Sequence, residues 1–122
     1  SVSAFLLNAL PIFDYLKNHQ QAYDYISKDL NFLVDEDRYC IDNTYLGMIL
    51  YETGRHDEAI QKLKEAEMRC KNPQVLSMCK SFLGLAYFDK RMYREALPYL
   101  REMSLAHPDL KDRYEYCMAM CQ

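Results

Sequence analysis

The chain has 122 residues, enough for one domain, and its 15 basic and 18 acidic residues give a formal net charge of −3. Half of the residues are hydrophobic, which excludes a disordered tail. Charges of both signs are mixed along the whole chain, so we expect no cationic surface for nucleic acid or for an anionic membrane. No apolar run approaches the roughly 18 residues that span a bilayer. These properties favour another protein as the partner, with no nucleic acid and no membrane.

The first five residues contain neither an initiator methionine nor the basic-then-apolar start of a signal peptide. We therefore interpret the chain as a piece of a longer protein.

The five cysteines are an odd number and lie in apolar, helix-patterned segments: Cys40, Cys70, Cys79, Cys117 and Cys121. A free cysteine behaves as a small hydrophobic residue in a reducing compartment. We therefore expect thiols and an intracellular, cytoplasmic protein. Cys70 and Cys79 flank Asn72-Pro73 and are able to approach each other across that turn, but they too are expected to be thiols.

Helical spacing of apolar residues predicts helices over residues 3–17, 19–34, 38–53, 56–70, 74–89, 92–106 and 109–121. Strands are not expected, because β-branched residues are sparse and strict alternation is absent. Gly54 is suited to end a helix, and the prolines of Asn72-Pro73 and at Pro108 are suited to start one. Pro11 and Pro98 lie within predicted helices, where each removes a hydrogen-bond donor, so a kink or a shortened helix is predicted at both.

Small and bulky residues recur at an interval of 37 residues. Leu46-Gly47 matches Leu83-Gly84 at this interval, and Ala59 matches Ala96. The same interval joins Leu63 with Leu100, Ala66 with Met103, Ala22 and Ile26 with Ala59 and Leu63, and Gly84 with Cys121. Several matches at one offset indicate an internal repeat. We predict one domain over 1–122 with units at 3–36, 40–72 and 77–108 and a partial or capping helix at 109–121.

Residues 43–60 and 82–97 resemble tetratricopeptide repeats. The first helix of that repeat carries Leu-Gly and then a large residue, here Leu46, Gly47 and Leu50, and again Leu83, Gly84 and Tyr87. The second helix carries an alanine, a bulky residue and a small one, here Ala59, Leu63 and Ala66, and again Ala96, Leu100 and Met103. The resemblance covers residues 40–108 and is weak over 1–36, where Ala9-Leu10 replaces the Leu-Gly pair.

The resemblance implies an all-α fold, a right-handed α-α superhelix of about three helix pairs with a C-terminal single helix. The family's repeat is usually about 34 residues long. We expect the additional residues to lengthen the turns between units, around residues 35–37 and 70–72.

A rival resemblance is to pentatricopeptide repeats, which bind RNA and share the stretch from Gly54 to Ala59. Those repeats lack the Leu-Gly pair and are usually basic, so the acidic balance of this chain disfavours RNA binding.

In tetratricopeptide arrays the first helix of each pair lines a concave, partner-binding face. Transferred to this sequence, that face consists of Leu7, Pro11, Ile41, Thr44, Met48, Tyr51, Met78, Ser81, Leu85, Phe88 and Met118. An apolar strip rich in methionine suits a helix or an extended peptide of a partner, and the module would scaffold a larger complex. The clamp by which some members hold terminal carboxylates is not expected, because its positions hold Leu7, Thr44, Tyr45, Met48, Met78 and Phe82.

Two alternatives stay open for this face. The strip is core if other parts of the protein cover it, and Met48→Glu or Leu85→Glu tests this, since loss of partner binding with intact helicity marks a surface. Alternatively, the chain self-associates by stacking Met118, Met120 and Cys121 at its end onto another copy.

An enzyme is not expected, and neither are catalytic residues, cofactors or metals. No nucleophile elbow, phosphate-binding glycine loop or His-Glu-x-x-His motif is present. Cys117 and Cys121 lack the further ligands of a zinc site, and the acidic residues 35–37 lack the spacing of a calcium loop. His19 and His56 align with Tyr93, where we expect packing in the turn of each helix pair.

Overall fold

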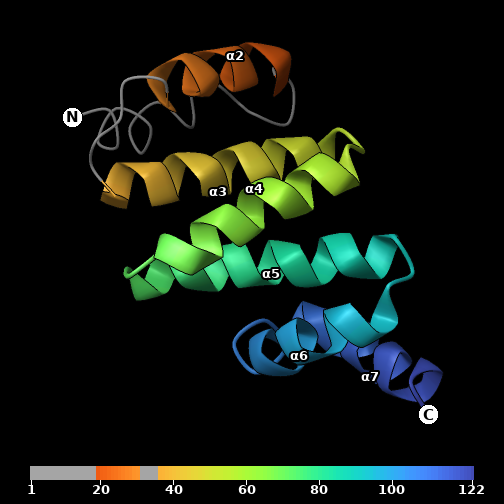
Figure 1. The fold of residues 1–122 in the computed structure, drawn as a ribbon. Helices are drawn as coiled ribbons and strands as arrows, with labels where there is room; N and C mark the ends of the chain where they lie inside the picture. The colour runs from red at the N-terminus through yellow and green to blue at the C-terminus, as the bar shows by residue number, and fades with distance from the viewer. Residues whose placement is uncertain (1–18, 31–35) are drawn as a thin grey trace.

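The computed structural model describes residues 19–30 and 36–122, and this part of the chain is helical without any strand (Figure 1). The elements are α2 (His19–Leu30), α3 (Glu36–Glu52), α4 (His56–Arg69), α5 (Pro73–Asp89), α6 (Tyr93–Met103), the 3-10 turn η1 (Pro108–Leu110) and α7 (Lys111–Met120). The expectation of an all-helical chain is confirmed for these residues. The predicted helix over 3–17, with Leu7 and Pro11, lies outside the described residues.

Consecutive helices pack against each other along the chain (Figure 1). Helix α2 contacts α3, and each later helix contacts the next one. Helix α3 also contacts α5, so the first helices of two successive pairs lie side by side. The two long first helices, α3 and α5, each have 17 residues and begin 37 residues apart.

The connection between α4 and α5 is short because Asn72 and Pro73 start α5 at once. The Asn72 side chain accepts hydrogen bonds from the backbone N–H groups of Gln74 (2.9 Å) and Val75 (3.2 Å). Pro73 occupies the first turn, where its missing N–H costs nothing. Only residues 70–72 separate the two helices. The expected longer turns are therefore wrong here, and the 37-residue interval is filled by the long first helices instead.

Pro98 lies inside α6, which continues through it and ends at Met103. The sequence predicted this helix to reach residue 106. The helix is shorter than predicted, but it continues for five residues beyond Pro98, so the hydrogen bond that this proline cannot donate does not explain where it ends.

Glycines lie at both main helix crossings. A Cβ on Gly47 would come within 2.4 Å of Leu63 Cγ, and a Cβ on Gly84 within 3.0 Å of Leu100 Cδ2. The two contacts are repeat-equivalent, because both partners are 37 residues apart. The surrounding side chains are fully buried: Ala59, Leu63, Ala66, Ala96 and Leu100. The structure thus confirms that small residues let paired helices approach closely.

The turns within the two complete helix pairs also repeat. Among the described residues, positive φ angles occur at Gly54 (82°) and at Arg91 (62°), which are 37 residues apart. The Gly54 N–H donates to the Tyr51 carbonyl at 3.0 Å, and the Arg91 N–H donates to the Phe88 carbonyl at 2.9 Å. The turn therefore requires a left-handed backbone conformation at this position. Glycine adopts that conformation freely, whereas arginine adopts it at some cost in strain.

Helix α7 packs one residue out of the repeat register. Cys117 is fully buried in a cluster with Ala96 and Leu100 of α6, just as Cys79 is buried with the equivalent residues of α4. These two cysteines are 38 residues apart, not 37. The 3-10 turn η1 directly precedes α7, whereas α5 begins at Pro73 without such a turn. Cys121, which the sequence aligns with Gly84, is the C-cap of α7 and is half-buried.

Candidate protein-binding groove

A groove of about 560 Å³ runs along α5 and is also lined by the segment before α7. Four large apolar side chains line it: Met78, Phe82, Leu85 and Leu110. Ser77 and Ser81 complete the wall, and the rim consists of Pro73, Gln74, His107 and Asp109. The volume falls within the range of pockets that bind small molecules or single side chains.

The groove follows one stripe of α5. Met78, Phe82 and Leu85 are spaced four and three residues apart, which places them on the same side of the helix. The residues of this stripe pack against two hydrophobic clusters. Met78 and Phe82 pack against the cluster that contains Met48, and Leu85 packs against the cluster that contains Leu110.

The groove has few free polar groups and one fixed charge on its rim. The Ser81 hydroxyl donates to the Ser77 carbonyl at 2.9 Å, and the Ser77 hydroxyl lies 3.6 Å from the Met103 sulfur. The carboxylate of Asp109 is exposed beside the apolar wall. The groove therefore suits apolar side chains, with a place for a cation or a hydrogen-bond donor at Asp109.

Three of the predicted site residues, Met78, Ser81 and Leu85, line this groove together. Ile41, Tyr51 and Phe88 are half-buried elsewhere on the first helices. The Tyr51 hydroxyl donates to Asp89 at 2.7 Å, and its ring contacts those of neighbouring aromatic residues. Met118 is 36% exposed on α7 and does not line the groove.

Thr44 and Met48 are buried, with exposed fractions of 1% and 6%. The Thr44 hydroxyl donates to the Cys40 carbonyl at 2.8 Å, while Met48 belongs to the cluster formed with Ile26 and Ile49. Their placement on an open face is corrected: in α3 this part of the strip is core, the alternative that the sequence left open.

Sequence reasoning missed Phe82 and Leu110 as groove residues. Phe82 lies four residues after Met78 on the same stripe, so helical spacing could have found it. Leu110 comes from the 3-10 turn before α7, and no repeat position predicted its contact with α5.

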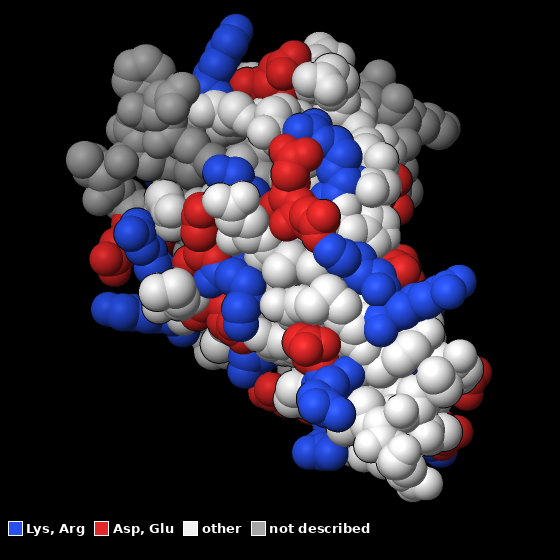
Figure 2. Space-filling model, turned by 45° about the vertical axis from the view of Figure 1, so that its right-hand side comes forward, with Lys and Arg blue, Asp and Glu red and all other residues white. Residues whose placement is uncertain are grey.

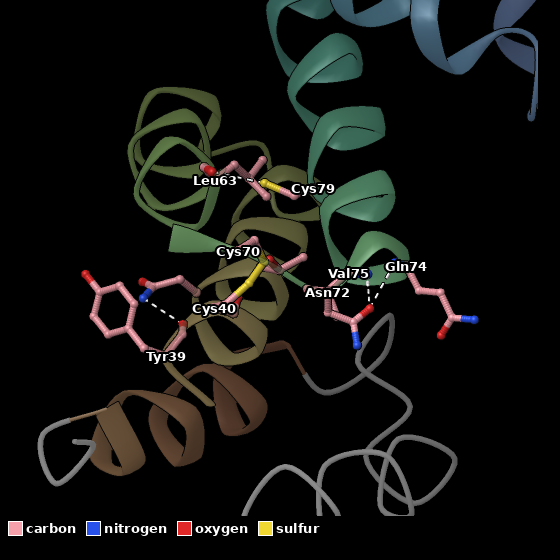
Figure 3. Close-up of a disulfide and its surroundings, with 10 residues drawn as sticks. Tyr39, Cys40, Leu63, Cys70, Asn72, Gln74, Val75 and Cys79 are labelled. Atoms are coloured by element: carbon pink, nitrogen blue, oxygen red, sulfur yellow. Dashed lines mark hydrogen bonds between the residues drawn. A yellow bond between two sulfur atoms is a disulfide. The ribbon is translucent and has the colours of Figure 1, made fainter. Parts of the chain in front are cut away.

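A disulfide joins Cys40 near the start of α3 to Cys70 just after α4 (Figure 3). Their Cα atoms are 5.3 Å apart, a separation that suits a disulfide. The prediction that both are thiols is therefore wrong, because the antiparallel hairpin brings together two residues 30 positions apart. Cys79, Cys117 and Cys121 are free. The intracellular location, which rested on free cysteines, stays a prediction.

The aromatic residues expected in the turns of the helix pairs do pack there. The rings of Tyr51 and His56 are 5.0 Å apart, and those of the equivalent residues Phe88 and Tyr93 are 5.5 Å apart. His56 also lies 3.4 Å from a carboxylate oxygen of Asp89. These contacts join a helix start to the end of its neighbour, as the sequence predicted.

A polar cluster between α4 and α6 brings together Lys64, Glu67 and Tyr99. The Lys64 ammonium donates to the Tyr99 hydroxyl at 2.9 Å, and that hydroxyl donates to Glu67 at 2.9 Å. Burial raises the pKa of Tyr99, and the hydrogen bond with Tyr99 raises the pKa of Lys64. Both groups therefore keep their protons near neutrality, so neither is prepared to act as a base or nucleophile.

Comparison with known proteins assigns no family: no protein-family model, curated protein or solved structure matches the chain. Within the described ranges, no helix is long and apolar enough to cross a membrane. Over those same residues, no group of three or more histidine, cysteine or acidic side chains is arranged to hold a metal ion.

Proposed function

We propose that this chain is a tetratricopeptide-like array that binds a partner protein in the groove along α5. The bound segment is a helix or extended peptide that inserts apolar side chains between Phe82, Leu85 and Leu110. A basic residue of the same segment pairs with Asp109. The module would in this way hold its partner within a larger complex.

One observation carries the proposal. Three residues that the family resemblance places on the binding face, Met78, Ser81 and Leu85, line a single apolar groove. The repeat-equivalent crossings at Gly47 and Gly84 support the array itself. A right-handed superhelical course of the helix pairs is part of the proposal.

Selection from a displayed peptide library tests the proposal without knowledge of the partner. We expect the protein to enrich peptides with two or three apolar residues at helical or alternate spacing and a basic residue nearby. Leu85→Glu should lower the affinity for these peptides by about tenfold or more, because it would place a carboxylate in the apolar wall.

Met68→Glu is the matched control, since Met68 is 85% exposed on α4 and does not line the groove. It should leave peptide affinity unchanged. Enrichment of no peptide, or peptides that bind the Leu85→Glu protein equally well, would refute groove binding.

A second candidate is self-association through α7. Tyr116, Met118 and Met120 are 48%, 36% and 53% exposed, and the end of the molecule that carries α7 shows an area without charged residues (Figure 2). Exposed apolar residues gathered at one end favour contact with another protein surface. Light scattering at several concentrations tests this: a mass that rises with concentration and falls back in Met120→Glu supports it, and a constant monomer excludes it.

A further inference from the structure

In the sequence, the Cys40–Cys70 disulfide lies close to the residues at one end of the groove. Cys70 caps α4, its N–H donating to the Ala66 carbonyl at 2.8 Å. Only two residues then separate it from Pro73, which together with Gln74 forms part of the groove rim. The disulfide therefore anchors the turn from which the groove-lining helix starts.

The second helix pair closes without such a bond. The residues 37 positions after Cys40 and Cys70 are Ser77 and His107, and both line the groove. Helices α5 and α6 nevertheless pack through the same glycine–leucine crossing as α3 and α4. Packing alone is thus sufficient to form a hairpin of this kind, and the disulfide adds a separate constraint.

A small thiol is able to reach the disulfide. A hollow of about 410 Å³ beside it is lined by Cys40, Ile41, Asp37, Lys71 and Asn72. Cys70 is half-buried, whereas Cys40 is only 2% exposed. Cys70 is therefore the more exposed residue of the pair, and we take its sulfur as the point of attack by a nucleophile from solvent.

We propose that the Cys40–Cys70 disulfide is a redox-controlled clamp on the groove. A low-molecular-weight thiol, as its thiolate, attacks the Cys70 sulfur, and Cys40 leaves as a thiolate that takes up a proton. A second thiol attacks the mixed disulfide and releases Cys70, so two thiols become one external disulfide and two protein thiols. Reduction frees the turn at 70–72 and weakens binding in the groove. The effect on binding rests on the proposed function, whereas the effect on the turn does not.

Hydrogen exchange tests the clamp directly on the whole chain. Peptide mapping without reductant should find a Cys40–Cys70 link, and a dithiol should raise the number of alkylated cysteines under denaturing conditions by two. Amide exchange over residues 70–76 should then become faster, while exchange in the equivalent segment 107–113 should not change. A map without this link, or exchange that reduction leaves unaltered, would overturn the clamp.

Binding of the uncharged apolar dye Nile red tests the link to the groove. Reduction should weaken dye binding by about fivefold, the lower end of typical couplings between linked sites. The Cys40→Ser, Cys70→Ser double variant should bind weakly with or without reductant. Leu85→Glu should abolish the binding in both redox states.

The possible outcomes separate the two proposals. Dye binding that Leu85→Glu does not reduce would overturn the groove as a binding site, whatever the exchange result. Dye binding that depends on Leu85 but is equal in both redox states would overturn the control of the groove by the disulfide. Since reduction acts on the wild-type chain, the test stands even if the double variant fails to fold.

Discussion

The helix pairs α3–α4 and α5–α6 share their internal packing and differ in their outer faces. In both pairs a glycine of the first helix receives a leucine of the second, and the turn contains one left-handed residue. On the outer face, Met48 of α3 is buried in the core, whereas the equivalent Leu85 of α5 lines an open groove. The repeat thus specifies how paired helices meet, and the residues outside that contact determine which pair carries an open groove.

The two helix pairs also differ in whether a disulfide joins their helices. The first is bonded between Cys40 and Cys70, and the second carries Ser77 and His107 at the same places. The first pair is therefore cross-linked, whereas the second is held by packing alone.

Glutamate at the repeat-equivalent positions Met48 and Leu85 should give the largest difference in the free energy of unfolding. Met48→Glu places a carboxylate in a site that is 6% exposed, and we expect a loss of about 3 kcal/mol or more in the free energy of unfolding. Leu85→Glu should cost about 1 kcal/mol or less and keep the helical circular dichroism. Urea unfolding measures both. Equal losses would show that the α5 stripe is core as well, and the groove proposal would fail.

Removal of the disulfide should have the next largest effect. The bond closes a loop between residues 30 positions apart, so Cys70→Ser should lower the free energy of unfolding by about 3 kcal/mol. Reduction of the wild-type chain should cause a similar loss, seen in thermal unfolding with and without a dithiol. The control in the second pair, Ser77→Ala, should change stability by about 0.5 kcal/mol or less. A Cys70→Ser protein as stable as wild type would mean that the pair is not cross-linked in solution.

Alanine at the two glycine crossings should have unequal effects. The added Cβ would lie 2.4 Å from Leu63 Cγ at Gly47, but 3.0 Å from the more peripheral Leu100 Cδ2 at Gly84. Overpacking typically costs about 1–3 kcal/mol, and alanine regains up to about 1 kcal/mol of helix propensity. We expect Gly47→Ala to lose about 1–2 kcal/mol and Gly84→Ala to be nearly neutral, both measured by urea unfolding. The reverse order would contradict the closer approach of the helices at Gly47.

Alkaline pH should weaken the fold through its buried thiols, the smallest of these effects. Burial raises the pKa of Cys79, between α4 and α5, to about 12 and that of Cys117, between α6 and α7, to about 11. In the unfolded chain these thiols ionise near pH 9. Their contribution to stability is therefore complete below about pH 9 and is lost as the pH rises toward 11–12.

At pH 10 each thiol should account for about 1 kcal/mol of lost stability. Unfolding free energies of wild type, Cys79→Ala and Cys117→Ala across this range measure the effect. Each variant should show a flatter pH dependence than wild type. An unchanged slope in both would mean that other groups govern the alkaline limit.

Local periodicity was sufficient to predict the helices and their crossings. Helix ends from residue 36 onward lie within a few residues of the predicted ones, since caps and apolar spacing are properties of neighbouring residues. Gly47 and Gly84 could be placed at crossings because only a small residue permits that approach. Part of the candidate site followed from the same logic: Met78, Ser81 and Leu85 share a stripe of one helix.

Only the tertiary structure decided the rest, because it depends on distances between segments remote in sequence. Met48 and Leu85 are equivalent in the repeat, and nothing in their local patterns distinguishes a buried position from a groove. The bond between Cys40 and Cys70 needs the two far ends of a hairpin to meet. Leu110 lies beside the groove residues of α5 because the 3-10 turn before α7 places it there. Side-chain spacing describes one helix at a time, whereas burial, cross-links and grooves belong to several helices at once.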